Sequence, residues 1–125
     1  MKRLVLESWL LLLCFEAVMR VRHFKSLHRI VRDYRRHTPH GGVPQSSEEL
    51  CRAMDLACVF YFKHVVCLQR SAATTILLRR YDWDAELVIG TQMMPSRFHA
   101  WVEIGDSVVN DKPYVAQIFQ VLERC

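Results

Sequence analysis

Residues 67–78, with the sequence CLQRSAATTILL, precede three shorter stretches, and together these four decide the fold: AELVIG at 85–90, FHAWVEI at 98–104 and VVND at 108–111. In the first stretch, apolar residues recur at helical spacing. This predicts a helix that begins at or just before Cys67 and ends near Arg79 and Arg80. The later stretches have the composition and alternation typical of strands, and residues 118–122 are expected to close the sheet. Because the connections are too short for crossovers, the sheet is predicted to be antiparallel.

The first half of the chain has a helical pattern. Apolar residues at steps of three and four predict helix over residues 3–36, with a break near Arg22 or His23. The Pro- and Gly-rich segment 37–44 is predicted to be a loop, after which Ser46 or Ser47 caps a helix that runs to about His64. Helices first and strands second indicate an α+β fold.

Composition and charge limit the classes of protein that the chain can belong to. The chain has 125 residues, of which 51% are hydrophobic and 24% charged, a balance typical of one globular domain. The net charge of +4 comes mostly from residues 20–36, where cations alternate with apolar residues. This pattern indicates the solvated face of a helix rather than a nucleic-acid site. The five cysteines are an odd number with irregular spacing, which favours reduced thiols and a cytoplasmic location.

The apolar N-terminus is predicted not to enter a membrane. Glu7 and Glu16 bracket only residues 8–15, whereas a spanning helix needs roughly 20 apolar residues. A small-residue cleavage site of the kind that follows a secretory signal is also missing.

Three residues in the second half, Cys67, His99 and Asp111, have settings suited to thiol catalysis. A cysteine in the first turn of a helix lies at the positive end of the helix dipole, which favours the thiolate, and its N–H group points to where an oxyanion would form. An imidazole can pair with the thiolate and later protonate a departing amine, and a carboxylate fixes the imidazole tautomer. Gln69 and Trp101 are candidates for a second oxyanion donor or a substrate contact.

Each of these residues also has an ordinary structural interpretation. A cysteine in an apolar helix is usually a small buried hydrophobe, which is the interpretation preferred for Cys14, Cys51 and Cys58. His99 could simply pack on Trp101, and Asp111 could be a turn residue. Metal binding is not expected and no cofactor is predicted, because the sequence contains no Cys-x-x-Cys or His-Glu-x-x-His motif and no Gly-rich phosphate loop.

The turn after residue 104 determines whether Asp111 can reach His99. Along an alternating strand, His99, Trp101 and Glu103 face one side. A strict two-residue turn at Gly105 and Asp106 would pair Asp111 with the opposite face. The triad therefore predicts a three-residue loop or a bulge.

Four separated blocks of the sequence resemble one known family. They are CLQRS at 67–71, AELVIG at 85–90, HAWVE at 99–103 and VVND at 108–111. In this order they resemble the lasso-peptide leader peptidases of the transglutaminase-like superfamily of cysteine proteases. The opening LESW at 6–9 and the basic helix near Phe24 extend the resemblance over nearly the whole chain. Two departures, YDWD at 81–84 and the order Gly105-Asp106, concern the strand connections and not the triad.

The resemblance implies a transglutaminase- or papain-like core in residues 46–125, preceded by a helical segment at 1–36, within a single domain over 1–125. It implies a peptidase that cuts a ribosomally made precursor between leader and core, with Cys67 as nucleophile, His99 as base and Asp111 as the orienting group. The implied partners are the precursor peptide, a separate leader-binding recognition protein and the ATP-dependent lasso cyclase. The apolar N-terminal helix and its basic continuation, which includes Arg29 and Arg32, are expected to dock the recognition partner or an acidic leader.

Two other functions remain open at this stage. An enzyme of the same superfamily could transfer its acyl group to an amine and act as a transamidase. A relative that had lost catalysis could serve as a peptide-binding module with Cys67 inert.

Overall fold

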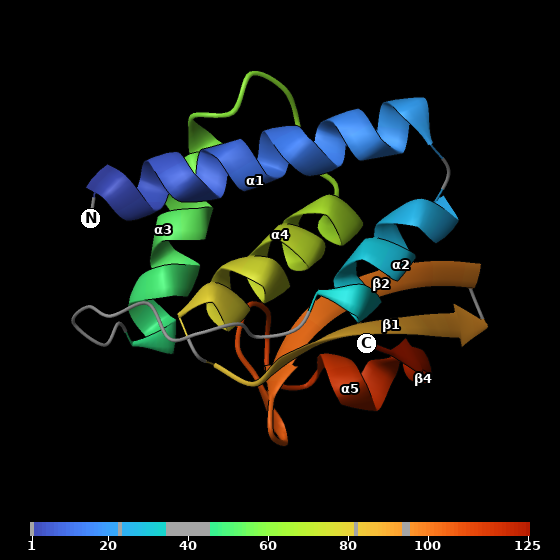
Figure 1. The fold of residues 1–125 in the computed structure, drawn as a ribbon. Coiled ribbons are helices and arrows are strands. Elements are labelled where there is room, and N and C mark those ends of the chain that lie inside the picture. Colours follow the sequence, from blue (N-terminus) through green and yellow to red (C-terminus); the bar gives the residue numbers. More distant parts are fainter. Residues whose placement is uncertain (1, 23, 35–45, 82, 94–95) are drawn as a thin grey trace.

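The computed structural model describes residues 2–22, 24–34, 46–81, 83–93 and 96–125 (Figure 1), so the loop predicted at 37–44 lies outside the described residues. The helices are α1 (Lys2–Val21), α2 (Phe24–Asp33), α3 (Ser47–Val59), α4 (Cys67–Arg80) and α5 (Val115–Ile118). The strands are β1 (Ala85–Met93), β2 (Ser96–Ile104), β3 (Ser107–Val108) and β4 (Gln120–Arg124). The predicted α+β class is confirmed.

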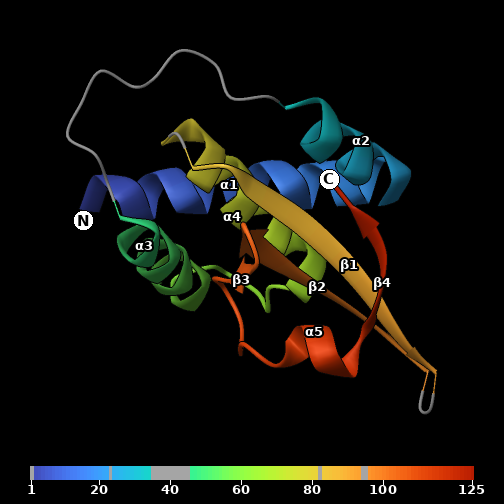
Figure 2. The ribbon, with the colours of Figure 1, turned by 90° about the horizontal axis from the view of Figure 1, so that it is seen from below.

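The elements form layers, with α1 on one side of α4 and the sheet on the other (Figures 1 and 2). The strand order is β3-β2-β1-β4, and each described pair is antiparallel, as predicted. Short α5 lies on the face of the sheet away from α4. Strands β1 and β2 thus have buried residues on both faces. This explains why consecutive residues in these strands are apolar.

Alternate strand residues build two separate apolar clusters. Leu87, Ile89, Ala100 and Val102 join the main core under α4, together with the inner faces of α1 and α3. Val88 and Trp101 face the other way and pack with Val115 of α5. His99 shares this second face with Trp101 by strand alternation.

The helix boundaries agree with the sequence at several points. The break between α1 and α2 falls where it was predicted, and α4 begins at Cys67 and ends at Arg80. Ser46 is the N-cap of α3, and its hydroxyl accepts a hydrogen bond from the N–H of Glu49 at 3.1 Å. The prediction that α3 runs to about His64 was wrong, because the helix ends at Val59.

Tyr61, two residues after the end of α3, packs against α1. Its side chain turns inward and is only 7% exposed, and its hydroxyl lies 3.4 Å from the carbonyl oxygen of Leu12 and 3.5 Å from Glu16 on α1. Among the described residues, no helix has the length and hydropathy needed to cross a bilayer.

Candidate active site

Cys67 is the first residue of α4, and its side chain is exposed. Val66 precedes it in an extended conformation, and no described side chain caps the helix. The first turn also has no acidic residue, in contrast to α3, where Ser46, Glu48 and Glu49 occupy the N-terminus. The first N–H groups of α4 and the positive end of its dipole therefore remain available to a negative charge at the Cys67 sulfur or at a bound oxygen.

His99 lies near the start of β2 and is hydrogen-bonded to Asp111. The Nε2 atom of His99 is 2.5 Å from Oδ2 of Asp111, and both side chains are about one quarter exposed. Since a carboxylate only accepts hydrogen bonds, the contact requires the proton on Nε2. In the neutral imidazole, Nδ1 is then the basic nitrogen. The other oxygen of Asp111, Oδ1, accepts from the N–H of Lys112 at 2.7 Å, which fixes the carboxylate.

The prediction of a three-residue loop or a bulge between β2 and β3 was wrong. Ile104 pairs with Ser107 and Glu103 with Val108, so Gly105 and Asp106 form a two-residue turn, with Gly105 at a φ of +61°. Asp111 nevertheless reaches His99, because regular pairing stops after Val108. Only one further backbone bond, from the N–H of Val109 to the carbonyl oxygen of Val102, follows.

The side chain of Asn110 takes the place of a backbone carbonyl in the next hydrogen bond of the strand pair. Its side-chain Oδ1 accepts from the N–H of Val102 at 2.7 Å, and its Nδ2 donates to Oγ of Ser71 at 3.1 Å. Ser71, one helical turn after Cys67, donates in turn to the carbonyl oxygen of Ala100 at 3.0 Å. This latch of Ser71 and Asn110 joins α4, β2 and the segment that carries Asp111. Both residues belong to blocks of sequence that carry the family resemblance, but the sequence analysis gave neither of them a role.

Aromatic rings support the imidazole. The ring of Phe119, just after α5, stacks on that of His99 with centroids 5.1 Å apart and planes at 27°. Trp101 is fully buried next to both rings, at centroid distances of 6.0 Å and 6.2 Å. Gly90 of β1 makes this packing possible, because a Cβ there would lie 2.7 Å from Trp101. Phe119 was also missed by the sequence analysis.

One pocket brings Cys67 and His99 together. It has a volume of about 220 Å³ and is lined by residues of α4, β1, β2 and β4. The lining residues are Cys67, Leu68, Ile89, Phe98, His99, Ala100, Leu122 and Glu123. Cys67 and His99 thus line the same pocket. Asp111, the third residue of the predicted triad, is hydrogen-bonded to His99.

Gln69 and Trp101 do not lie in this pocket. Gln69 is 2% exposed, and its amide donates to the carbonyl oxygen of Leu12 at 2.8 Å, on the α1 side of α4. The indole N–H of Trp101 donates to Glu103 at 2.8 Å. Since both donors are buried and already hydrogen-bonded, neither is assigned a role toward an oxyanion or substrate.

The other thiols differ from Cys67 in their surroundings. Burial raises the pKa of Cys51 to about 11 and also raises the pKa of Cys58 and of Cys125. Cys14 lies exposed on α1 and does not belong to the lining of the pocket. It therefore offers a reference thiol within the same molecule.

Comparison with known proteins identifies a family for the chain. A family model described as the transglutaminase-like superfamily matches residues 9–124. The microcin J25-processing protein McjB of Escherichia coli is 39% identical over 56 residues, which are 45% of this chain and 27% of that protein. The match thus spans about a quarter of the relative's length. No solved structure matches the chain.

Proposed function

Because the chain belongs to the transglutaminase-like superfamily, we propose that it is a cysteine peptidase that removes the leader from a ribosomally made lasso-peptide precursor. The observation that carries the proposal is the hydrogen bond from His99 to Asp111 beside the pocket that also contains Cys67. The similarity to a microcin J25-processing protein supports a role in maturing a peptide precursor.

The residues suit an acyl-transfer mechanism. The thiolate of Cys67 attacks the scissile carbonyl carbon, and the oxyanion that forms faces the free N–H groups of the first turn of α4. The imidazolium of His99 gives its Nδ1 proton to the departing amine, which leaves an acyl-enzyme thioester. Nδ1 then takes a proton from water as the water attacks, and the acid and the thiol are released. Asp111 holds the proton on Nε2 and stabilises the imidazolium.

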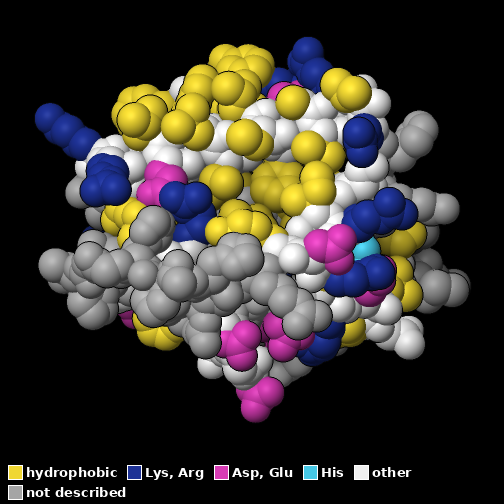
Figure 3. All heavy atoms as spheres, in the orientation of Figure 1, with side chains coloured by type: hydrophobic (Ala, Val, Ile, Leu, Met, Phe, Trp, Pro, Cys, Tyr) yellow, Lys and Arg dark blue, Asp and Glu magenta, His cyan; other side chains and the backbone are white. Residues whose placement is uncertain are grey.

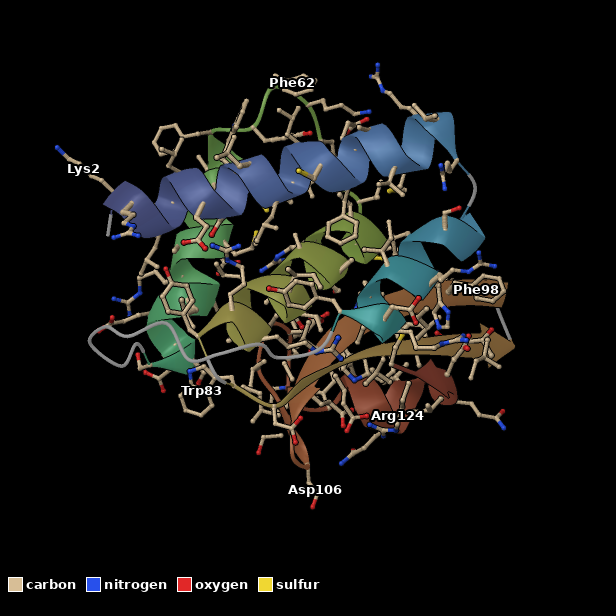
Figure 4. The ribbon with its side chains drawn as sticks, in the orientation of Figure 1. Lys2, Phe62, Trp83, Phe98, Asp106 and Arg124 are labelled. Carbon is tan, nitrogen blue, oxygen red and sulfur yellow. The ribbon has the colours of Figure 1, made fainter. Side chains whose placement is uncertain are left out.

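A separate recognition protein would present the leader. We assign its docking site to the apolar surface of α1 and the segment after α3, where Leu6, Leu10, Phe60 and Phe62 are between 48% and 71% exposed. Figure 3 shows apolar side chains gathered along α1, and Figure 4 shows Phe62 at the same edge of the molecule. Exposed apolar patches of this kind mark interaction surfaces. The five free thiols suit a reducing compartment, and we place the reaction in the cytoplasm.

The basic continuation of this helix is a weaker candidate for docking. Arg32 on α2 already donates to Oε1 of Glu123 at 3.3 Å and contacts His28 at 3.0 Å. Charge reversal at Arg32 would disturb the fold as well as any partner. The apolar pair Leu6 and Leu10 is therefore the better site for a docking variant.

The experiment is co-expression of the chain with a lasso-peptide precursor and its recognition protein, followed by mass spectrometry of the peptides. Hydrolysis gives two fragments whose masses add to that of the precursor plus one water, whereas transamidation joins two peptides. Cys67→Ala is expected to abolish cleavage, His99→Ala to come close to doing so, and Asp111→Ala to be less severe. Cleavage that persists in the well-folded Cys67→Ala variant would refute the proposal.

The state of the thiol is tested without a partner. The rate of iodoacetamide labelling is measured against pH for Cys67 and for Cys14, in the wild type and in His99→Ala. We expect Cys67 to react at a pH where Cys14 does not, and the difference to vanish in the variant. If the two thiols react alike, the measurement is repeated with the recognition protein and the precursor present. Equal reactivity of Cys67 and Cys14 in that complex would favour a non-catalytic peptide-binding module.

A further inference from the structure

The pocket next to Cys67 extends beyond what the chemical step needs. Cys67 and His99 occupy part of its lining, and the rest is mostly apolar: Leu68, Ile89, Phe98, Ala100 and Leu122. These side chains come from α4 and from three strands, so the pocket is a feature of the folded core and not of one loop.

Two large apolar side chains at the pocket are left open to solvent. Phe98 is 71% exposed and Leu122 is 56% exposed. Phe98 lies near the start of β2, at the end of the strand opposite Asp106 (Figure 4). Exposed apolar side chains that converge on a pocket beside reactive groups are typical of a site that a ligand covers.

The charged residue of the lining does not make the pocket a site for a cation. Oε1 of Glu123 lies 3.0 Å from Nε2 of His28 and 3.3 Å from Nη2 of Arg32, so its carboxylate is engaged with α2. An apolar group is therefore the better match for the remaining wall.

We propose that this pocket is the subsite for one large apolar side chain of the substrate, on the acyl side of the cleaved bond; this rests on the proposed peptidase function. Its volume of about 220 Å³ suits a side chain of the size of leucine or phenylalanine, because a cavity of about 150 Å³ holds benzene. The acyl part stays on the enzyme from attack to hydrolysis, whereas the amine part leaves after the first step. A subsite that contacts the acyl part therefore acts in both steps.

The test uses short peptide chloromethyl ketones, which alkylate an active-site cysteine after the peptide has bound. Matched probes carry leucine, phenylalanine or aspartate at the last or the last-but-one residue, and Cys67 labelling is followed by peptide mass spectrometry. At one of these positions, the apolar probes should label about tenfold to a hundredfold faster than the aspartate probe, a range typical of discrimination by a hydrophobic pocket. Iodoacetamide, which has no side chain to bind, serves as the reference reagent.

Two variants locate the effect. Leu122→Asp places a charge on the pocket wall and should slow labelling by the leucine and phenylalanine probes about tenfold or more, when each rate is divided by the iodoacetamide rate of the same variant. Ile30→Asp, at a residue of α2 that is 42% exposed and outside the lining, should change neither rate. If Leu122→Asp is poorly folded, as judged by its melting temperature, Phe98→Asp takes its place.

The outcomes separate this inference from the proposed function. Normal His99-dependent iodoacetamide labelling with equal rates for all peptide probes would overturn the subsite and leave the peptidase in place. Apolar probes that label as fast in both Leu122→Asp and Phe98→Asp as in the wild type, relative to iodoacetamide, would also overturn it. A Cys67 that reacts like Cys14 with iodoacetamide and with every probe would overturn both.

Discussion

Replacement of Asn110 by alanine should loosen the latch that joins the candidate nucleophile, Cys67, to the candidate base, His99. In the native chain Asn110 accepts from the N–H of Val102 at 2.7 Å and donates to Ser71 at 3.1 Å. The variant leaves a partly buried N–H group without its partner, which costs about 1–3 kcal/mol, and it removes a second hydrogen bond to a buried hydroxyl. Because the junction is only partly buried and water can enter, we expect a loss of about 2 kcal/mol in the free energy of unfolding.

Urea unfolding and iodoacetamide labelling measure the two consequences separately. The unfolding midpoint of Asn110→Ala should fall with an unchanged slope, and the rate advantage of Cys67 over Cys14 near neutral pH should shrink, because Asp111 and His99 are no longer held in register with α4. Asn110→Asp keeps an acceptor for Val102 and should lose less stability. Ser107→Ala, at an exposed residue of the same hairpin, is the control and should change neither quantity.

A wild-type midpoint together with wild-type labelling in Asn110→Ala would refute this reasoning. A lower midpoint with unchanged labelling at a temperature where the variant is folded would limit the latch to a structural role. Only the combination of both losses supports Asn110 as a positioning residue.

Three further predictions concern the supports of the site. Gly90→Ala should destabilise the fold by about 1–3 kcal/mol and slow Cys67 labelling, because the new Cβ lies 2.7 Å from Trp101; thermal melting and labelling test this. Arg79→Ala should cost more than about 3 kcal/mol in urea unfolding, since its guanidinium donates four hydrogen bonds to backbone carbonyls that join α2, β1 and β4. Burial raises the pKa of Glu103, but hydrogen bonds from Arg124 and Trp101 outweigh this effect and hold it below the usual value of 4.5. The stability from Glu103 is therefore full above that pH and lost below it, and Glu103→Gln should show a shallower loss of stability in acid.

Periodicity and composition were sufficient to predict the main helices and strands, because each of them is long and buries at least one face. The helix at Cys67 and the strands that carry Ala85 and His99 were predicted close to their observed bounds. Helix α5 was missed, since four residues give no periodic signal and its formation depends on Val115 packing on the far side of the sheet.

The candidate triad residues could be found from sequence because their residue types and order are distinctive, but their geometry could not. The expectation of an irregular turn assumed that the ladder after Gly105 continues through Asp111. Instead, the side chain of Asn110 accepts the hydrogen bond from the N–H of Val102. The backbone after Val109 therefore leaves the strand pair, and Asp111 reaches His99. A rule for backbone register cannot anticipate a side chain that substitutes for the backbone.

Gln69 illustrates the same limit from the other direction. Its position two residues after Cys67 made it a natural candidate for an oxyanion donor, but a helix turns by about 100° per residue, so this spacing places the two side chains on nearly opposite faces. Gln69 points to the carbonyl oxygen of Leu12 and to Glu16 on α1, and helps to dock that helix.

The residues that align the candidate nucleophile and base are thus ordinary in sequence and specific only in space. Ser71 lies one turn after Cys67 on α4, and the carbonyl oxygen it binds belongs to Ala100, the neighbour of His99 on β2. A shift of α4 along the strand by one residue would break this bond and move the sulfur away from the imidazole at the same time. Ser71 also accepts a hydrogen bond from Asn110, the neighbour of Asp111 in the chain. The latch of Ser71 and Asn110 therefore sets the relative position of Cys67, His99 and Asp111. If the peptidase proposal is right, substitutions in the latch should slow peptide cleavage, although neither residue contacts a reacting atom.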